Sequence, residues 1–344
     1  MNFFRSFPQK NKKKFVRQKF FDYFCAINRK VYHKEPSKTS DLQMAGKNIG
    51  ARPFIRWQGA KCQYLRILTQ ALPADFANTP DVTYIEPFVG SGSMLFHMLQ
   101  TYPNITRAVI NDNNLDLMRV YNTVRDRASE LISELKQIQK QFLSLDEAKR
   151  AHYFDEAREE FSERLVDGIR HAALFIFLNK TSVGGQGLKY HAARRYDICE
   201  EAVLLADSKV LKDVNILCDD FEKTYNEACG NTFFFLDPPC ANGSHTPEWS
   251  SREHVRLKKF CDLLNFRHFD WMLTGSDCRS KRLSSNSVEQ LYSNYDIQRI
   301  WTPQAIKATP EQREKQPSEL LIRNFQREIL SLRNLQCTQL SLAF

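Results

Sequence analysis

The chain has 344 residues, with 49 lysines and arginines against 40 aspartates and glutamates, which gives a net charge of +9 at neutral pH. This length suits one large domain with a smaller inserted or appended one, and the charge favours a polyanionic partner. The sequence contains no apolar run long enough to cross a bilayer and no secretory leader, so we expect neither a membrane span nor export.

The first predicted segment is a basic amino-terminal extension over residues 1–49. Residues 1–35 contain ten basic and two acidic side chains, including the run Lys10-Asn11-Lys12-Lys13-Lys14, so most of the net charge lies here. Such a run is typical of a DNA-contacting arm, a packing extension or a solvated leader, and composition does not choose between them. Serine, threonine, glycine and proline in residues 36–50 predict a linker before the main body.

Residues 82–93 predict a strand, a glycine turn and the start of a helix near Ser93. Gly90 and Gly92 allow positive φ values and let a ligand approach the backbone closely, although the motif is not Gly-x-Gly-x-x-Gly. The next predicted strand, residues 108–110, is followed by Asp112, which lies 20 residues after Gly92. Rossmann-like sites place an acid on the ribose hydroxyls at this spacing, so the features together predict a cofactor site.

An inserted region of helices is predicted between residues 122 and 205. The expected helices cover residues 128–142, 145–164 and 168–179, and a further helix is expected over residues 197–212. The stretch 181–195 between them contains three glycines and several basic residues. This composition is typical of a loop that contacts phosphates and base edges, and equally of a surface loop with solvated charges.

The most informative motif is Asp237-Pro238-Pro239-Cys240, which ends the apolar run 232–236, a predicted buried strand of a parallel sheet. Open α/β sheets build active sites at this end of a strand. A carboxylate and a nearby backbone carbonyl can accept both N–H bonds of an exocyclic nucleobase amine, and the prolines keep the turn rigid. The motif favours methyl transfer by positioning and electrostatics, with an ordinary strand-to-loop turn as the alternative.

Six segments in order resemble the Dam family of DNA N6-adenine methyltransferases, over about residues 50 to 326. The tetrapeptide 237–240 is similar to the family's Asp-Pro-Pro-Tyr. The six segments are a Trp-x-Gly-Gly-Lys-like stretch at 54–61 with alanine for the second glycine, the glycine loop 86–93, an Asp-x-Asn to Tyr-Asn stretch at 111–122, a Leu-Asn-Arg-like stretch at 173–180, and the predicted strands 271–277 and 319–325.

The resemblance implies S-adenosylmethionine as cofactor and adenine in double-stranded DNA as substrate. Asp112 would hold the ribose, and Asp237 would serve both the amino end of the cofactor and the target amine. Taken alone, Trp57 would be a core aromatic and Lys61 a solvated charge, but their spacing around Gly59 favours a role in the site. The implied cofactor contacts are Trp57, Lys61, Phe88, Gly90, Gly92, Asp112 and Asp237, and the candidate DNA contacts are Lys180, Lys189, Arg194 and Arg195.

Cys240 departs from the resemblance, because the fourth residue of the family's motif is aromatic and stacks on the extruded adenine. Stacking contributes about 1–3 kcal/mol per base, so its loss would lower the rate by about one to two orders of magnitude. A Pro-Cys dipeptide also occurs in cytosine-C5 methyltransferases, but the chain has no Glu-Asn-Val segment, and a structural cysteine is the better interpretation. The candidate catalytic residues are Asp237, Pro238, Pro239 and Cys240.

These features predict an α/β, Rossmann-like methyltransferase fold of three layers, with a catalytic domain at 50–121 and 206–330. A helical target-recognition insertion is expected at 122–205 and a tail at 331–344. The predicted function is site-specific methylation of adenine N6 in DNA, as in restriction-modification, phage protection or epigenetic marking. The alternatives are a weakened or inactive relative that binds DNA, and an enzyme for cytosine N4 or for RNA.

We expect a monomer that lies in the cytoplasm and associates with the nucleoid through DNA. The nine cysteines include no Cys-x-x-Cys pair, which argues against a zinc site. Their odd number and scattered positions also favour reduced thiols over a disulfide framework. The sequence therefore predicts no metal and no membrane partner.

Overall fold

The structure is a computed structural model that describes residues 50–164, 168–193, 196–239, 250–276, 288–301 and 318–325. By its internal contacts the chain divides into Met1–Asn48 and Ile49–Phe344, and every described residue belongs to the second unit. The predicted amino-terminal extension and the predicted tail at 331–344 lie outside the described residues, as do Cys240, Arg194 and Arg195.

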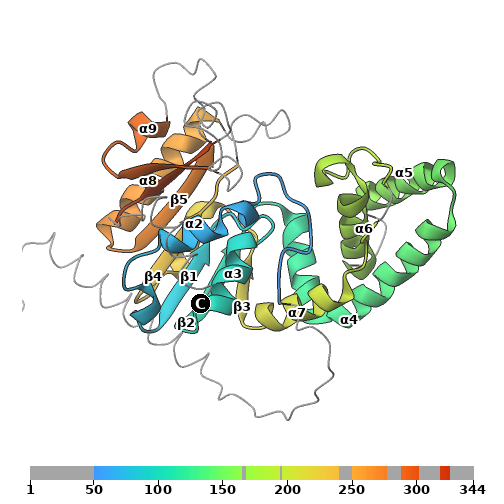
Figure 1. Cartoon of the computed structure of the whole chain (residues 1–344), viewed down its shortest axis with the longest axis horizontal. Helices are drawn as coiled ribbons and strands as arrows, with labels where there is room; N and C mark the ends of the chain where they lie inside the picture. Colours follow the sequence, from blue (N-terminus) through green and yellow to red (C-terminus); the bar gives the residue numbers. More distant parts are fainter. Residues whose placement is uncertain are drawn as a thin grey trace, which may run out of the picture. The chain divides into compact units, whose positions relative to one another are not determined.

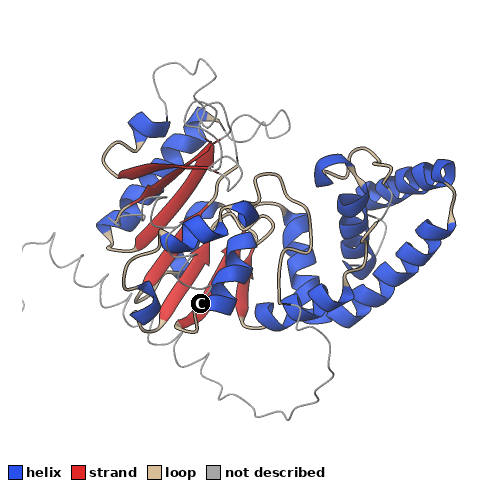
Figure 2. Cartoon of the chain, viewed as in Figure 1, coloured by secondary structure: helices blue, strands red, loops and turns tan. Residues whose placement is uncertain are grey.

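The described residues form a seven-stranded mixed sheet (Figures 1 and 2). The strand order is β3-β2-β1-β4-β5-β7-β6, in which β3, β2, β1, β4 and β5 run parallel. Strand β7 lies antiparallel between β5 and β6. The strands are β1 (Val82–Glu86), β2 (Ile105–Asn111), β3 (Val214–Leu217), β4 (Thr232–Leu236), β5 (Asp270–Ser276), β6 (Asp296–Trp301) and β7 (Ser318–Arg323).

The central strands β1 and β4 are buried along their whole length, which explains their nearly continuous apolar sequences. Successive side chains of a strand point to opposite faces of the sheet. Phe233 and Phe235 of β4 therefore belong to one hydrophobic core, while Phe234 and Leu236 belong to the other. The sheet separates two cores, and helices cover both faces.

One core packs α2 (Leu65–Gln70), α3 (Ser93–Thr101) and α4 (Leu115–Ser144) against the sheet. The other packs α8 (Ser251–Phe266), α9 (Val288–Leu291) and the 3-10 helix η4 (Phe221–Glu227). This arrangement is the predicted three-layer, Rossmann-like methyltransferase fold, which the structure confirms (Figure 1).

Strands β1 and β4 lie side by side, although β2, β3 and the helices between them separate the two in sequence. The chain leaves β1 toward β2 on one side and leaves β4 toward β5 on the other. Open α/β sheets form their ligand-binding crevice at such a switch point, outside the carboxyl ends of the strands. The glycine loop after β1 and the Asp-Pro-Pro segment after β4 both start there.

A helical insertion connects β2 to β3 and consists of α4, α5 (Glu147–Glu163), α6 (Gly168–Thr181), the 3-10 helix η3 (Val183–Gly185) and α7 (Glu201–Leu211). Helix α4 begins at Leu115, where Asn114 caps it by accepting a hydrogen bond from the Leu117 N–H (3.0 Å). The backbone of Arg127 is non-helical, so α4 is kinked next to residue 128, where the sequence predicted the helix to start. The predicted boundary at 205 and 206 falls inside α7.

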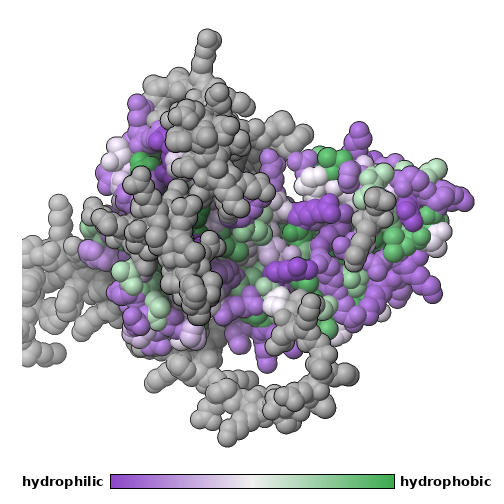
Figure 3. Space-filling view, viewed as in Figure 1, coloured by the Kyte–Doolittle hydropathy of each residue, from purple (hydrophilic) through white to green (hydrophobic). Residues whose placement is uncertain are grey.

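The insertion has its own aromatic packing. Phe142 of α4 lies edge-on to Phe177 of α6, with ring centroids 5.2 Å apart, and Phe154 of α5 packs against the same ring. In Figure 3 the visible surface over these helices is mainly hydrophilic, with small separate hydrophobic areas. These aromatic side chains belong to the same hydrophobic core that covers one face of the sheet, and α4 also contacts β3 while α7 contacts α3.

Among the described residues, no helix is both long and apolar enough to cross a membrane. Strands β3 and β6 were not predicted, since both are partly exposed and β6 lacks a continuous apolar run. The strands that the sequence did predict all appear, as β1, β2, β4, β5 and β7.

Truncating a central side chain of β4 should destabilise the fold strongly. Phe234 is fully buried between Phe260 and Phe269, so Phe234→Ala should lower the free energy of unfolding by about 3–5 kcal/mol. Phe266 on α8 is 68% exposed, and Phe266→Ala should change that free energy by less than about 0.5 kcal/mol. Urea denaturation of both variants measures the difference, and equal losses would contradict the assignment of the core.

Candidate active site

The glycine loop after β1 is shaped by two residues with positive φ, Gly90 (48°) and Gly92 (71°). A Cβ atom on Gly90 would lie 2.8 Å from the indole ring of Trp57, so only glycine lets that ring rest on the loop. A Cβ atom on Gly92 would lie 2.7 Å from the hydroxyl of Tyr121, which itself donates to the carbonyl of Gly90 (3.0 Å). The absence of a side chain at Gly90 and Gly92 therefore lets Trp57 and Tyr121 pack closely on the loop.

Asp112 follows β2 and is tied to the same loop. Its Oδ2 accepts a hydrogen bond from the N–H of Gly90 (3.3 Å), and its Oδ1 accepts one from the N–H of Asn114 (3.0 Å). Burial raises the pKa of this carboxyl, and the backbone hydrogen bonds from Asn114 and Gly90 oppose that shift. The structure therefore brings the glycine loop and the acid after the second strand into contact, as the sequence predicted.

Asp237 follows β4 and is held through one of its two oxygens. Oδ1 lies 2.7 Å from Nζ of Lys61 and accepts a hydrogen bond from the hydroxyl of Thr274 on β5 (2.8 Å). Both of these contacts reach Oδ1, and the side chain is 22% exposed. Of the two prolines that follow, Pro238 is buried and Pro239 is exposed. The arrangement fixes the carboxylate while part of it faces the outside.

Lys61 is 3% exposed, although it carries a charge. A buried ammonium requires partners that replace water, and here it donates to the carbonyl of Gly59 (2.8 Å) as well as pairing with Asp237. Glu319 of β7 lies 3.9 Å from the same amine. Lys61 thus connects the segment before the sheet to two of its strands.

Glu86, the last residue of β1, is a buried acid. It belongs to the segment 86–93, but the sequence did not indicate a role for it. It is 1% exposed and accepts a hydrogen bond from the hydroxyl of Tyr84 (2.5 Å). Burial raises the pKa of the Glu86 carboxyl to about 8, the nearby charge of Asp237 adds to the shift, and the bond from Tyr84 opposes it. Glu86 therefore holds a proton at neutral pH, next to an ionised pair. A charge that ends the otherwise uncharged strand 82–86 was the available signal.

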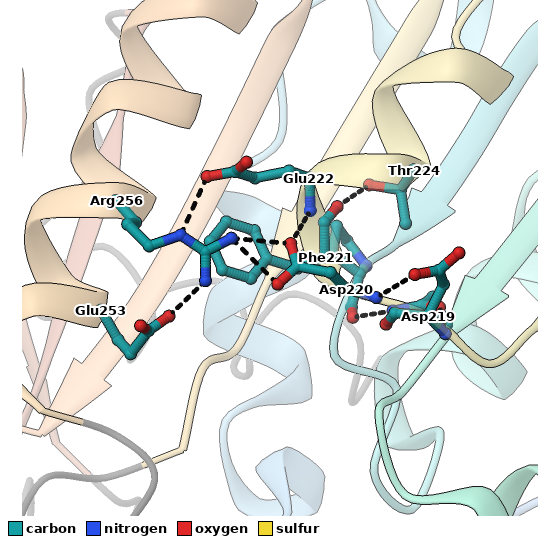
Figure 4. A network of polar contacts seen from close by, with 9 residues as sticks. Asp219, Asp220, Phe221, Glu222, Thr224, Glu253 and Arg256 are labelled. Carbon is teal, nitrogen blue, oxygen red and sulfur yellow. Dashed lines mark hydrogen bonds and ion pairs between the residues drawn. The ribbon is translucent and has the colours of Figure 1, made fainter.

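The segment after β3 forms a network of polar contacts with α8 (Figure 4). Arg256 of α8 donates to both oxygens of Asp220 (2.9 Å each), and its guanidinium lies 5.0 Å from the ring of Phe221. Phe221 packs in turn against Phe88 of the glycine loop, with ring centroids 5.2 Å apart. This connection could not be predicted from the sequence, because its parts lie far apart along the chain.

The predicted cofactor residues therefore lie in one connected cluster. Trp57 lies against Gly90, Gly90 is bonded to Asp112, and Phe88 belongs to the same loop. Lys61 is paired with Asp237, whose charge acts on Glu86 at the end of β1. All of these contacts lie at the carboxyl ends of β1, β2 and β4. The part of the chain that the structure describes contains no group of three or more metal-ligating side chains.

The candidate DNA contacts differ in how accessible their side chains are. Lys180 is 11% exposed on its side chain and forms an ion pair with Glu200, so its amine is occupied. Lys189 is exposed on the loop after α6. Asn179, next to Lys180, is buried and bonds to the backbone of Arg56, a role that its sequence context did not reveal.

Replacing Glu86 should change how stability depends on pH. Its folded-state pKa of about 8 lies above the unfolded value of about 4.3, so its contribution is full below pH 4.3 and is lost as pH rises to 8. Relative to Glu86→Gln, the wild type should therefore lose about 1.4 kcal/mol of unfolding free energy per pH unit in this range. Urea denaturation from pH 5 to 8 measures it, with Glu130→Gln on the exposed face of α4 as control. Parallel curves for wild type and Glu86→Gln would contradict the assignment.

The comparisons with known proteins agree with this geometry. Residues 57–306 match the family of D12 class N6 adenine-specific DNA methyltransferases. The chain is 32% identical over 293 residues to the type II methyltransferase M.MjaIII of Methanocaldococcus jannaschii, covering 80% of this chain and 99% of that protein. It is 25% identical over 306 residues to the type II methyltransferase M1.LlaDCHI of Lactococcus lactis subsp. cremoris, covering 83% and 99%.

The DNA adenine methylase of Escherichia coli K12 is 24% identical over 243 residues, covering 66% of this chain and 81% of that protein. The family match spans more than half of the chain and includes Trp57, the glycine loop, Asp112 and the Asp-Pro-Pro segment. The predicted resemblance and the predicted adenine methylation of DNA are thereby confirmed. The chain belongs to the D12 class of N6 adenine-specific DNA methyltransferases.

Proposed function

We propose that this methyltransferase uses S-adenosylmethionine to methylate N6 of an adenine rotated out of double-stranded DNA. The observation that carries the proposal is the carboxylate of Asp237, which Lys61 and Thr274 hold through the same oxygen at the switch point of the sheet. A fixed, partly exposed carboxylate suits an amine that must be oriented before it reacts.

The residues at this position are suited to bind S-adenosylmethionine. The positive φ values of Gly90 and Gly92 shape the loop after β1, and Trp57 packs on it at Gly90. Asp112 supplies a carboxylate beside the loop, suited to ribose hydroxyls. S-adenosylmethionine would supply an electrophilic methyl group here. Trp57, Lys61, Phe88, Gly90, Gly92, Asp112 and Asp237 are the residues proposed to bind it.

Asp237 is proposed to accept one N–H of the target amine through its Oδ2, since Lys61 and Thr274 both contact Oδ1. The carbonyl of Pro238 would accept the other N–H. Two acceptors draw electron density toward the nitrogen and turn its lone pair toward the methyl group. The neutral form of Glu86 keeps a further negative charge away from this carboxylate at neutral pH.

The proposed DNA contacts are Lys180, Lys189, Arg194 and Arg195. Lys189 is exposed and available for a phosphate, whereas Lys180 would have to exchange its partner Glu200 for DNA. Base flipping requires an unstacking cost of a few kcal/mol to be offset in the pocket. Binding to double-stranded DNA would place the protein with the nucleoid, and we propose that it acts as a monomer.

The direct test identifies the methylated base. Purified protein is incubated with S-adenosylmethionine and either unmethylated genomic DNA or RNA, and the digested nucleosides are identified by mass spectrometry. We expect N6-methyladenine from DNA, and a loss of at least about 100-fold in Asp237→Asn because the variant loses the oriented carboxylate.

Asp262→Asn is the matched control, because Asp262 also pairs with a lysine, Lys258 (2.7 Å), and accepts from a hydroxyl, that of Tyr295 (2.6 Å). This control should keep the wild-type rate, since Asp262 lies on α8 away from the site. Product from RNA alone, a different methylated base, or full activity in Asp237→Asn would each contradict the proposal.

A further inference from the structure

A short segment before the sheet is clamped by side chains from three different helices. We call residues 51–60 the strap. Gln100 of α3 binds both backbone groups of Ala51, accepting from its N–H (2.9 Å) and donating to its carbonyl (2.8 Å). Asp207 of α7 accepts a hydrogen bond from the N–H of Arg52 (2.9 Å). Asn179 of α6 holds Arg56, in the middle of the strap, through the same pair of backbone bonds that Gln100 makes to Ala51.

The side-chain amide of Asn179 makes three hydrogen bonds, all to backbone groups. Its Oδ1 accepts from the N–H of Arg56 (2.8 Å), and its Nδ2 donates to the carbonyl of Arg56 (2.8 Å) and to that of Gly185 (2.6 Å). The side chain is 3% exposed. Because a buried amide left unbonded costs free energy, this arrangement strongly favours one position of the strap relative to the Gly185 turn.

The turn itself lies directly on the strap. Gly185 has a φ of 75°, and a Cβ atom there would lie 2.7 Å from Cβ of Arg56 and 3.0 Å from its carbonyl oxygen. Backbone bonds from Val183 to Lys189 (2.9 Å) and from His191 to Thr181 (2.8 Å) close the loop that starts at this turn. The loop carries Lys189, so its position and that of the strap are linked.

The other end of this link is the cofactor site. Trp57 follows Arg56 in sequence and lies on Gly90, and Lys61 follows the strap and pairs with Asp237. Only one peptide bond therefore separates the residue held by Asn179 from the aromatic ring on the glycine loop. A shift of the strap on cofactor binding would move the loop after α6, and a shift of that loop would move Trp57.

We propose that Asn179 is a positioning residue that couples cofactor binding to DNA binding, by fixing the loop of residues 182–193 to the strap. The inference rests on the proposed function, in which this loop contacts DNA and Trp57 contacts the cofactor. Coupling of this kind is reciprocal, so each ligand raises the affinity for the other by the same factor. The coupling factor itself is the quantity that Asn179 controls.

The test measures that factor by calorimetry with S-adenosylhomocysteine, which binds without turnover. The ratio of its Kd in buffer to its Kd with saturating, sheared, unmethylated genomic DNA is determined for each variant. We expect a ratio of about fivefold or more for the wild type, in the usual range for linked sites. In Asn179→Ala the ratio should fall below about twofold, while S-adenosylhomocysteine alone still binds.

Gln100→Ala is the matched control, because Gln100 makes the same two bonds to the strap but does not contact the insertion loop. It should keep the wild-type ratio. Gly185→Ala provides a second variant, since its Cβ atom would push the turn off Arg56, and it should lower the ratio as Asn179→Ala does. If Asn179→Ala fails to fold, the ratio measured for Gly185→Ala alone decides the test.

An unchanged ratio in Asn179→Ala or, if that variant does not fold, in Gly185→Ala would overturn the inference. So would an equal loss in Gln100→Ala, or a wild-type ratio of one. Failure of the proposed function is recognised separately, because it would appear as an absence of N6-methyladenine in DNA treated with the wild-type protein.

Discussion

The ion pair between Lys61 and Asp237 is the interaction on which the site depends. It joins a segment that precedes the whole sheet to the carboxyl end of β4, with Glu319 of β7 nearby. Lys61 is almost completely buried, so its charge is tolerated only because these partners replace water. The proton held by Glu86 at neutral pH removes a further negative charge from the same neighbourhood. The pair therefore orients the carboxylate.

The strap extends this connection across the molecule. Gln100 anchors it to α3, Asp207 to α7 and Asn179 to α6, so one helix outside the insertion and two helices of the insertion position the same short segment. The insertion between β2 and β3 is thereby linked to residues of the proposed cofactor site, rather than being attached only through its two chain connections.

The features that are local in sequence were predicted from it. The apolar strand before Asp237, the glycines at 90 and 92 and the acid at 112 follow from periodicity and backbone chemistry, and the structure contains the predicted strands and turn. The pKa of Glu86 and the partners of Asn179 could not be predicted, because burial and distant backbone groups decide them. Lys180 is likewise paired with a residue 20 positions later, Glu200, whose proximity depends on the fold of the insertion.

The measurement that tests the central claim most directly is the single-turnover rate of methyl transfer in Lys61→Met. Removing Lys61 leaves Asp237 without the cation that orients its carboxylate, so we predict a loss of at least about 100-fold. Lys258→Met removes a comparable pair on α8, with Asp262, and should leave the rate unchanged. A folded Lys61→Met protein with the wild-type rate would contradict the account.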